Sequence, residues 1–436
     1  MYEQLKINQL VEELRQVSSQ LTDVRTGENG RYEVRDAAMS AFAVFFTQTP
    51  SFLAHQRDMA LRKGQSNAES LFALEKLPSD NQIRNLLDPV DPRQTEEMYH
   101  YAFAEMERTG LLDGLRSFAN QLLIVIDGTE YFSSQKIHCD QCSHQELQNG
   151  KTRYFHSVLT PVIAQPGNET VIPLEPEFIV PQDGHEKQDC ENQAIKRWIE
   201  RHGAFYAKRR VTLLGDDLYS HEPNCRLMLK YHLHFILVCK EESHGELYQT
   251  VNFLAANQVL GTKVIRRWMG KHAEIDTYCY THQVPIRAGG DALPVNWVEL
   301  TTTREDSGAV IYKNAWITDF AVGDTTVEAI ARDGRTRWKV ENENNNVLKT
   351  KGYHLEHNFG HGRKHLSALL LSLNLLAFLF HTLLDLVDAQ YHAIRRKLGA
   401  RRTFFTDLDA LLRYLLFSSW QEVLDFMFKG LELDSG

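Results

Sequence analysis

The stretch QLLIVIDGTEYF, residues 121–132, decides how this chain is expected to fold. It is a continuous apolar run that ends in a glycine-containing turn, which is typical of a strand buried in the middle of a sheet. Asp127 follows the apolar run directly. Because open α/β sheets carry their ligand sites at the carboxyl ends of strands, the first candidate functional residue lies where this strand ends.

The next segments along the chain predict four more strands and two helices. The expected strands span residues 153–164, 169–180, 209–217 and 234–240, and the expected helices span about 188–202, closed by Gly203, and 223–230. The order is then three strands, a helix, a strand, a helix and a strand. Because this is the order of the RNase H-like fold, we expect an α/β protein with an RNase H-like mixed sheet flanked by helices.

The remaining segments suggest four regions. Residues 1–115 have apolar side chains at helical spacing and predict a helical domain for DNA binding or dimerisation, with a helical lid as the alternative. Residues 116–240 form the first part of the core. Residues 241–336 are rich in Tyr, Trp, Thr and Val and predict a β-rich insertion. Residues 337–436 are expected to complete the core and to add C-terminal helices.

Charge excludes one broad class of protein. The 436 residues include 48 Lys and Arg against 57 Asp and Glu, for a formal net charge of −9. A generic basic nucleic-acid-binding protein has the opposite balance. If the chain binds nucleic acid, its positive charge must therefore be local.

Two features bear on the compartment. No signal peptide is visible in the first residues, and six cysteines without a regular framework indicate reduced thiols, so we expect a cytoplasmic protein.

Residues 366–384 carry no formal charge and are long enough to span a membrane. However, Ser367, Asn374, His381 and Asp388 recur every seven positions and lie along one helical stripe. We therefore predict a buried helix and no membrane association.

Three acidic positions carry the expected chemistry. Asp127 ends the first strand, the pair Asp216 and Asp217 ends the fourth, and Glu341 lies near the start of a later helix. The first and fourth strands are neighbours in an RNase H-like sheet. Three converging carboxylates would supply the hard oxygen ligands that Mg²⁺ prefers, and a pair of such ions catalyses phosphodiester displacement. An aspartate after a strand can also be a simple turn former.

The chain resembles the DDE transposases of bacterial insertion sequences, and among them the ISNCY-type members with a β-strand insertion between the second and third acids. The resemblance extends from Leu77 onward. The segments that carry it are LPSDNQIRNLLD (77–88), IDGTEYFSSQKIHCDQC (126–142), DGHEKQDCENQAIKRW (183–198), LLGDDLYS (213–220), VNWVELT (295–301), AWITDF (315–320), RWKVENENNNVLK (337–349) and GYHLEHNFGHG (352–362).

The resemblance implies a catalytic and metal-binding triad of Asp127, Asp216 and Glu341, with Asp217 and Glu343 as alternates. Asp216 is preferred because the family places an aromatic residue three positions later, here Tyr219, and Glu341 is preferred because Arg337 lies four positions earlier. Arg337 and Lys349 would contact DNA. The chain departs from the family pattern twice. Gly334 stands where the family has a tyrosine, and Lys349 lies one residue later than usual.

The activity implied by the resemblance is cleavage at the ends of an insertion sequence and joining of the freed 3′-hydroxyl to target DNA. Two Mg²⁺ ions, which Mn²⁺ would replace, are the implied cofactors. The implied partners are double-stranded DNA, as terminal inverted repeats and target, and a second copy of the chain in the DNA complex. A transposase-derived DNA-binding protein without transposition activity and a metal-dependent DNA nuclease are the alternatives.

Basic residues gather in three places along the sequence. The clusters are Lys263, Arg266, Arg267 and Lys271; Arg335, Arg337 and Lys339; and Arg395, Arg396, Lys397, Arg401 and Arg402. A solvated helix face is the ordinary interpretation of one such run, but three of them favour a track for phosphates. Trp268, Trp297 and Trp316 are candidates for stacking on a DNA base, with core packing as the alternative role for each.

A second constellation, IHCDQCSH, has the residue types of a zinc site. His138, Cys139, Cys142 and His144 are the candidate ligands, although one Cys-x2-Cys pair is incomplete evidence and adjacent residues bind one ion poorly together. A polar loop is the alternative. We interpret the histidines of GYHLEHNFGHGRKH, namely His354, His357, His361 and His365, as loop residues rather than as metal ligands.

Overall fold

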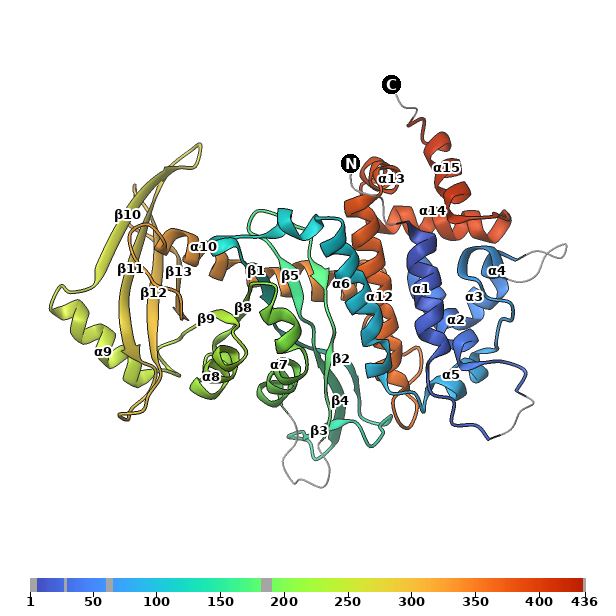
Figure 1. The fold of residues 1–436 in the computed structure, drawn as a ribbon, viewed down its shortest axis with the longest axis horizontal. Coiled ribbons are helices and arrows are strands. Elements are labelled where there is room, and N and C mark those ends of the chain that lie inside the picture. The colour runs from blue at the N-terminus through green and yellow to red at the C-terminus, as the bar shows by residue number, and fades with distance from the viewer. Residues whose placement is uncertain (1–5, 27–29, 60–65, 182–189, 434–436) are drawn as a thin grey trace.

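The computed structural model describes residues 6–26, 30–59, 66–181 and 190–433. Its centre is a nine-stranded mixed sheet in the order β10-β11-β12-β13-β9-β8-β1-β5-β6. The strand β1 (Leu122–Val125) is buried along its whole length, as the apolar run predicts, and lies inside this sheet between β8 and β5. Helices flank the sheet (Figure 1). The predicted α/β class with a mixed sheet is therefore confirmed.

Four strands around β1 set the geometry of its carboxyl end. β8 (Val211–Gly215) pairs with β1 in parallel, and β9 (His234–Val238) pairs with β8 in parallel. On the other side, β5 (Val162–Ala164) is antiparallel to β1, and β6 (Ile172–Pro173) is antiparallel to β5. The carboxyl ends of β1, β8 and β9 therefore meet at one edge of the sheet.

Two predicted strands are each divided into two. The first gives β4 (Thr152–Leu159) and β5, and the second gives β6 and β7 (Glu177–Ile179). The first division falls at Thr160 and Pro161, where the proline has no N–H for a ladder hydrogen bond. β4 then turns away from the central sheet and pairs with β2 (Gly128–Ser134), β3 (Ser143–Glu146) and β7 in a second sheet.

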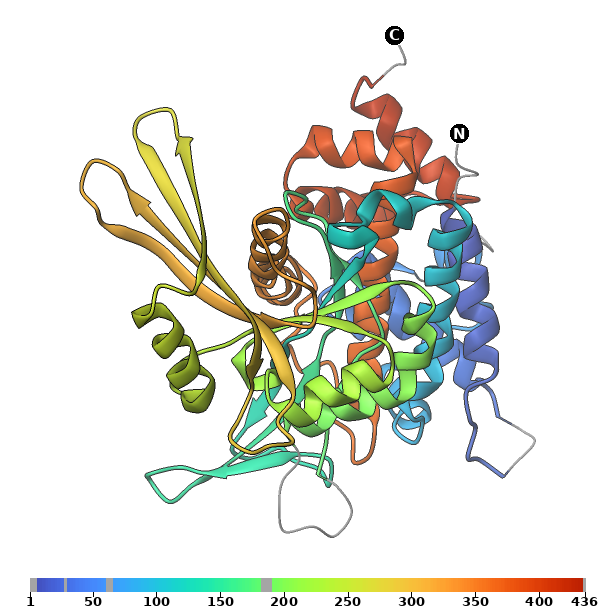
Figure 2. The same cartoon turned by 60° about the vertical axis from the view of Figure 1, so that its left-hand side comes forward.

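The predicted β-rich insertion continues the central sheet. β10 (Gly261–Trp268), β11 (Ala273–Pro285), β12 (Pro294–Arg304) and β13 (Val310–Thr318) form an antiparallel series, and β13 joins it to β9. The series projects away from the helices near the chain termini (Figures 1 and 2). Two helices also fall within residues 241–336, namely α9 (Gly245–Ala256) and α10 (Val327–Arg335).

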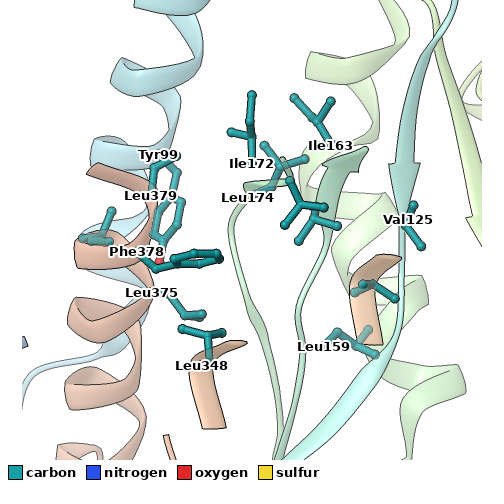
Figure 3. Close-up of a cluster of buried hydrophobic side chains, with 14 of the residues drawn as sticks. Tyr99, Val125, Leu159, Ile163, Ile172, Leu174, Leu348, Leu375, Phe378 and Leu379 are labelled. Carbon is teal, nitrogen blue, oxygen red and sulfur yellow. The ribbon is translucent and has the colours of Figure 1, made fainter. Parts of the chain in front are cut away.

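Helices near both ends of the chain share one body. α12 (Leu366–Val387) contacts both α2 (Val34–Thr47) and β6. Figure 3 shows Phe378 and Leu379 of α12 beside Tyr99, near Ile172 and Leu174 of the sheet side. The other helices are α1 (Ile7–Ser19), α3 (Phe52–Asp58), α4 (Asn67–Phe72), α5 (Asp80–Leu87), α6 (Glu96–Arg108), α7 (Glu191–Ala207), α8 (Glu222–Lys230), α11 (Asn346–Thr350), α13 (Ala389–Leu398), α14 (Arg401–Tyr414) and α15 (Trp420–Gly430).

The helix α12 is long and apolar enough to cross a membrane, but 89% of its most apolar stretch is buried inside the protein. Asn374 and His381, from the predicted polar stripe, bond to the carbonyl and to the hydroxyl of Tyr353. This burial is typical of a core helix and is compatible with a soluble protein. The predicted start of α7 at 188 lies outside the described residues.

Candidate functional site

Asp127 and Asp216 lie side by side at the edge where β1 and β8 end. Val125 is paired with Leu214 in the parallel ladder, and each aspartate stands two residues beyond its member of that pair. The N–H of Ile126 donates to the carbonyl of Leu214 at 2.9 Å, so the pairing persists up to the residue before Asp127. Two of the predicted acids are thus brought together by strand register alone.

The electrostatics of Asp127 reflect a crowded acidic site. Burial raises the pKa of Asp127 to about 7, and the neighbouring charges of Asp216 and Glu191 add to this rise, whereas the Arg337 guanidinium opposes it. A like charge close to a desolvated carboxylate disfavours its ionised form. A bound divalent cation would remove this repulsion, so the oxygen donors present at this edge fit a Mg²⁺ site.

Glu191 is a third acid at this edge, and it was not predicted from the sequence. It is the first residue of α7, and its Oε2 accepts a hydrogen bond from the Tyr219 hydroxyl at 2.7 Å. A Cβ at Gly128 would lie 2.4 Å from the Glu191 carboxyl carbon, so glycine next to Asp127 leaves room for that carboxylate. An acid in a first helical turn is common, and no local pattern distinguishes this one.

Asp217 is held by other contacts. Its carboxylate accepts hydrogen bonds from the Lys240 N–H at 2.7 Å and from the Ser243 hydroxyl, and it lies 3.7 Å from the His244 ring. These partners belong to the segment between β9 and α9. Asp216 instead accepts from the Leu218 N–H at 2.9 Å and adjoins Asp127. The two neighbouring aspartates therefore differ in their surroundings, and Asp217 is the one that fastens the loop.

Glu341 lies in a π-helical segment, η5 (Val340–Asn345), that contacts β5. In the same segment, Asn345 accepts a hydrogen bond from the Thr160 hydroxyl at 2.8 Å, and the Thr160 N–H donates to the Asp127 carbonyl at 3.0 Å. The segment is thereby fixed beside Asp127. Glu341 is exposed and Glu343 is half-buried. Among described residues, no three acids at this edge have ligand atoms all within 4.8 Å of one another.

A cavity of about 360 Å³ brings two of the predicted basic clusters together. Arg267 from β10 lines it together with Arg335 and the buried Lys339, and Glu169 and Glu328 also contribute. Trp338 is a further lining residue, 44% exposed, that was not predicted from the sequence. Arg337 directly precedes Trp338 in the sequence, and its positive charge opposes the rise in the pKa of Asp127. The cavity and the acidic edge are therefore neighbouring parts of one surface.

Three other predicted DNA contacts are each bonded to another residue of the protein. Lys263 donates to the Asp324 carbonyl at 2.8 Å, Arg266 pairs with Glu305 at 2.7 Å, and Lys349 pairs with Glu356 at 3.0 Å. Trp268 is 65% exposed at the end of β10, whereas Trp297 and Trp316 are buried. Of the three candidate tryptophans, only Trp268 is open to a DNA base.

The third basic cluster is placed differently from the expected phosphate track. Arg395 is buried, and its guanidinium lies 5.2 Å from the centre of the Phe404 ring. The Arg401 guanidinium lies 5.5 Å from the centre of the Phe378 ring. Two members of this cluster thus pack on aromatic side chains of the helical body, which is how arginine behaves where its flat guanidinium can stack.

The predicted zinc loop is part of a different group of four. Cys139 and Cys142 lie together with His156 of β4 and His361 of the loop before α12. His138 instead stacks on Tyr154 with ring centroids 4.4 Å apart, and His144 is exposed on β3. His361 lies in a loop as expected, but its ring also belongs to this group of possible metal ligands, which the sequence interpretation did not foresee. His156 lies 14 residues after Cys142, a spacing typical of zinc sites that could have identified it. His361 could not be identified from spacing, because it lies 219 residues from Cys142.

Comparison with known proteins adds no family to this description. No model of a known protein family matches the chain, and no curated protein is significantly similar to it in sequence.

Proposed function

We propose that this protein is a DNA transposase of the DDE type, which cleaves insertion-sequence ends and joins the 3′-hydroxyl to target DNA. The observation that carries the proposal is the adjacency of Asp127 and Asp216 at the ends of the parallel strands β1 and β8, with Arg337 facing them. Carboxylates at such an edge, beside a basic cavity, suit phosphoryl transfer on a polyanion.

The strand arrangement supports an RNase H-like core. Around β1 the order is β6-β5-β1-β8-β9, with β5 and β6 antiparallel to their neighbours and with β8 and β9 parallel to β1. In the order of the chain this is third, second, first, fourth, fifth, which is the RNase H-like arrangement. The inserted strands β10–β13 lie between the second and third proposed acids, as in the transposases that the sequence resembles.

Both departures from the family pattern have a physical explanation. A Cβ at Gly334 would lie 2.6 Å from the Trp316 indole nitrogen, so Trp316 fills the space next to α10 and excludes a larger residue there. The one-residue delay of Lys349 coincides with the π-helical segment η5, which contains Glu341 and ends at Asn345, before Lys349. A π-bulge adds one residue to a helix, so it absorbs an extra residue without rotating the next turn.

In the proposed mechanism Asp127, Asp216 and Glu341 would hold two Mg²⁺ ions, or Mn²⁺ in their place. When bound, such ions activate the attacking oxygen and stabilise the leaving oxygen. Arg337 holds a DNA phosphate next to the acids, Arg267, Arg335 and Lys339 guide the adjoining backbone through the cavity, and Trp268 stacks on an unpaired base. A homodimer acting on two element ends in the cytoplasm completes the proposal.

Strand-transfer assays with DNA from the gene's flanks and Mg²⁺ test this proposal. We expect cleavage and joining by the wild type, and at least about a 100-fold loss, equivalent to about 3 kcal/mol, in Asp127→Asn, Asp216→Asn and Glu341→Gln. Asp217→Asn and Glu343→Gln are the matched controls and should keep most of the activity. Cleavage without joining would indicate a nuclease, and binding alone would indicate a transposase-derived DNA-binding protein.

A further inference from the structure

We infer that Cys139, Cys142, His156 and His361 form a structural zinc site. The site is independent of the proposed catalysis, because its ligands are thiols and imidazoles rather than carboxylates. Zinc is the metal that such a Cys2His2 set selects, whereas Mg²⁺ prefers oxygen ligands. The four side chains come from the turn between β2 and β3, from β4 and from the loop that precedes α12.

The distances within the group match a tetrahedron around one zinc ion. With Zn–S near 2.3 Å and Zn–N near 2.0–2.1 Å, tetrahedral ligands lie about 3.8 Å apart for two sulfurs and about 3.6 Å apart for sulfur and nitrogen. The two Sγ atoms are 3.9 Å apart. His156 Nε2 lies 3.6 Å from Cys139 Sγ and 3.4 Å from Cys142 Sγ, and His361 Nε2 lies 3.6 Å from Cys142 Sγ.

The local backbone prepares the two thiols for a metal. The Cys142 N–H donates to the Cys139 carbonyl at 3.1 Å, which closes a tight turn, and the Cys139 N–H points to Cys142 Sγ at 3.4 Å. An N–H that donates to sulfur stabilises a metal-bound thiolate. A disulfide needs sulfurs about 2.05 Å apart, and these sulfurs are unbonded.

Burial indicates a structural rather than a catalytic site. Cys142, His156 and His361 are all buried, and Cys139 is partly covered. Aromatic rings pack around the ligands, with Tyr131 stacked on His156 and Phe132 4.3 Å from His361 between ring centroids. Four protein ligands in an enclosed position leave no coordination place for a substrate, which distinguishes structural from catalytic zinc.

The ion would join parts of the chain that are far apart in sequence. Cys139, Cys142 and His156 belong to the second sheet, and His361 brings in the loop that leads to α12. The β2 strand of that sheet begins one residue after Asp127. Zinc would therefore fix to the helical body a sheet whose first strand begins next to Asp127.

Metal analysis of the full chain, purified after growth with zinc, tests this inference. We expect about one zinc ion per chain and, after exchange with Co²⁺, the intense visible bands of a tetrahedral thiolate site. Cys142→Ser and His361→Ala should lose the metal, and His361→Cys should keep it while thiolate-to-cobalt absorption increases. His138→Ala and His144→Ala are the matched controls from the same loop and should keep a full complement.

Two results would overturn the inference. One is a folded wild type that contains no zinc and takes up Co²⁺ without tetrahedral bands, including the case of a Cys139–Cys142 disulfide detected by mass. The other is zinc that remains in His361→Ala but leaves in His138→Ala or His144→Ala. If the single-loss variants fail to fold, the Co²⁺ spectra of the wild type and of His361→Cys still decide the matter.

Discussion

Glu191 shows how one residue can join a site without any motif. Its carboxylate lies against Gly128, next to Asp127, and raises the pKa of Asp127 together with Asp216. Burial also raises the pKa of Glu191 itself, although the Tyr219 hydroxyl opposes this rise. Glu191 is thus a fourth acid near the proposed ions, held by one hydrogen bond.

If Glu191 helps to position the proposed ions, Glu191→Gln should lower cleavage about 10–100-fold, as supporting partners of metal ligands commonly do. The loss should shrink as Mg²⁺ is raised, which a purely structural role would not produce. Tyr219→Phe removes only the hydrogen bond and should have a smaller effect. Cleavage by Glu191→Gln with unchanged rate and unchanged Mg²⁺ dependence would exclude this role.

His55 provides a test of buried histidine in the helical body. It is 1% exposed in α3, and neither ring nitrogen has a hydrogen-bond partner among the described residues. Burial lowers the pKa of His55 from 6.5 to about 4, with Asp58 opposing. Between pH 6.5 and about pH 4, His55 is therefore protonated in the unfolded chain but neutral in the folded protein.

The contribution of neutral His55 to the free energy of unfolding is fully present above the pKa of the unfolded state, 6.5. It is lost as the pH falls toward the pKa of the folded state, about 4. Between pH 7 and pH 5, His55 should remove about 2 kcal/mol from the free energy of unfolding. Urea unfolding of wild type and His55→Leu at both values measures this difference. An equal pH dependence of the free energy of unfolding in both proteins would contradict the assigned shift.

At the scale of elements, α10 depends on a glycine that faces a tryptophan. Gly334 lies in α10, and a Cβ there would meet the fully buried Trp316 ring at 2.6–2.9 Å. The next residue back, Asp333, accepts hydrogen bonds from the Ser117 hydroxyl at 2.6 Å and from the Phe118 N–H at 3.1 Å. The helix is therefore fixed on both sides and has little freedom to move away.

Gly334→Ala should lower the free energy of unfolding by about 1–3 kcal/mol through overpacking, despite the better helix propensity of alanine. In combination with Trp316→Phe, the loss should be smaller than the sum of the two single losses, because the smaller ring makes room. Gly245→Ala at the start of α9, where nothing lies within 4 Å of the new Cβ, is the control and should be neutral. Additive losses would show that the two positions do not interact.

Local pattern predicted those elements whose burial is continuous. β1, β8 and β9 lie within the predicted segments, and α12 begins at the predicted residue and extends three residues beyond the predicted end, because each is an apolar run. The division at Thr160 and Pro161 could not be predicted, because it depends on where two sheets separate. The π-helical turn in η5 was equally hidden, since its contacts with β5 and with Thr160 join residues that are far apart in the sequence.

Only those residues of the candidate site could be predicted from the sequence whose positions follow from the ends and the pairing of strands. Asp127 and Asp216 were identified because strand ends and parallel pairing place them together. Glu191 and His361 were not, because each reaches its neighbours through the tertiary fold. His156 was missed although it lies 14 residues after Cys142, at a spacing typical of zinc sites. The sequence resemblance supplied Glu341 and Arg337, which no local pattern would have singled out.

At the scale of the whole molecule, the net charge of −9 and a basic cavity coexist. DNA binding should therefore be confined to the cavity and should weaken steeply with salt. Arg335→Ala, which removes one exposed lining charge, should lower the slope of log affinity against log salt by about 1. Arg304→Ala, from an exposed pair with Asp306, is the control. A wild-type affinity that is independent of salt would contradict a phosphate track.

Helices from both ends of the chain pack together in one helical unit. This unit can therefore form only when both ends have been synthesised. Phe42 of α2 packs on Phe380, and the Asn67 side chain donates to the Leu412 carbonyl, 345 residues further along the chain. At about 5–20 residues per second, these partners leave the ribosome roughly 20–70 s after the first helices. During that interval α2 can pack on α1 and α5, but the part of its surface that packs on α12 has no native cover. The N-terminal helices can therefore complete their native packing only after α12 has been synthesised. Until then chaperones or transient collapse would have to cover the exposed apolar side chains.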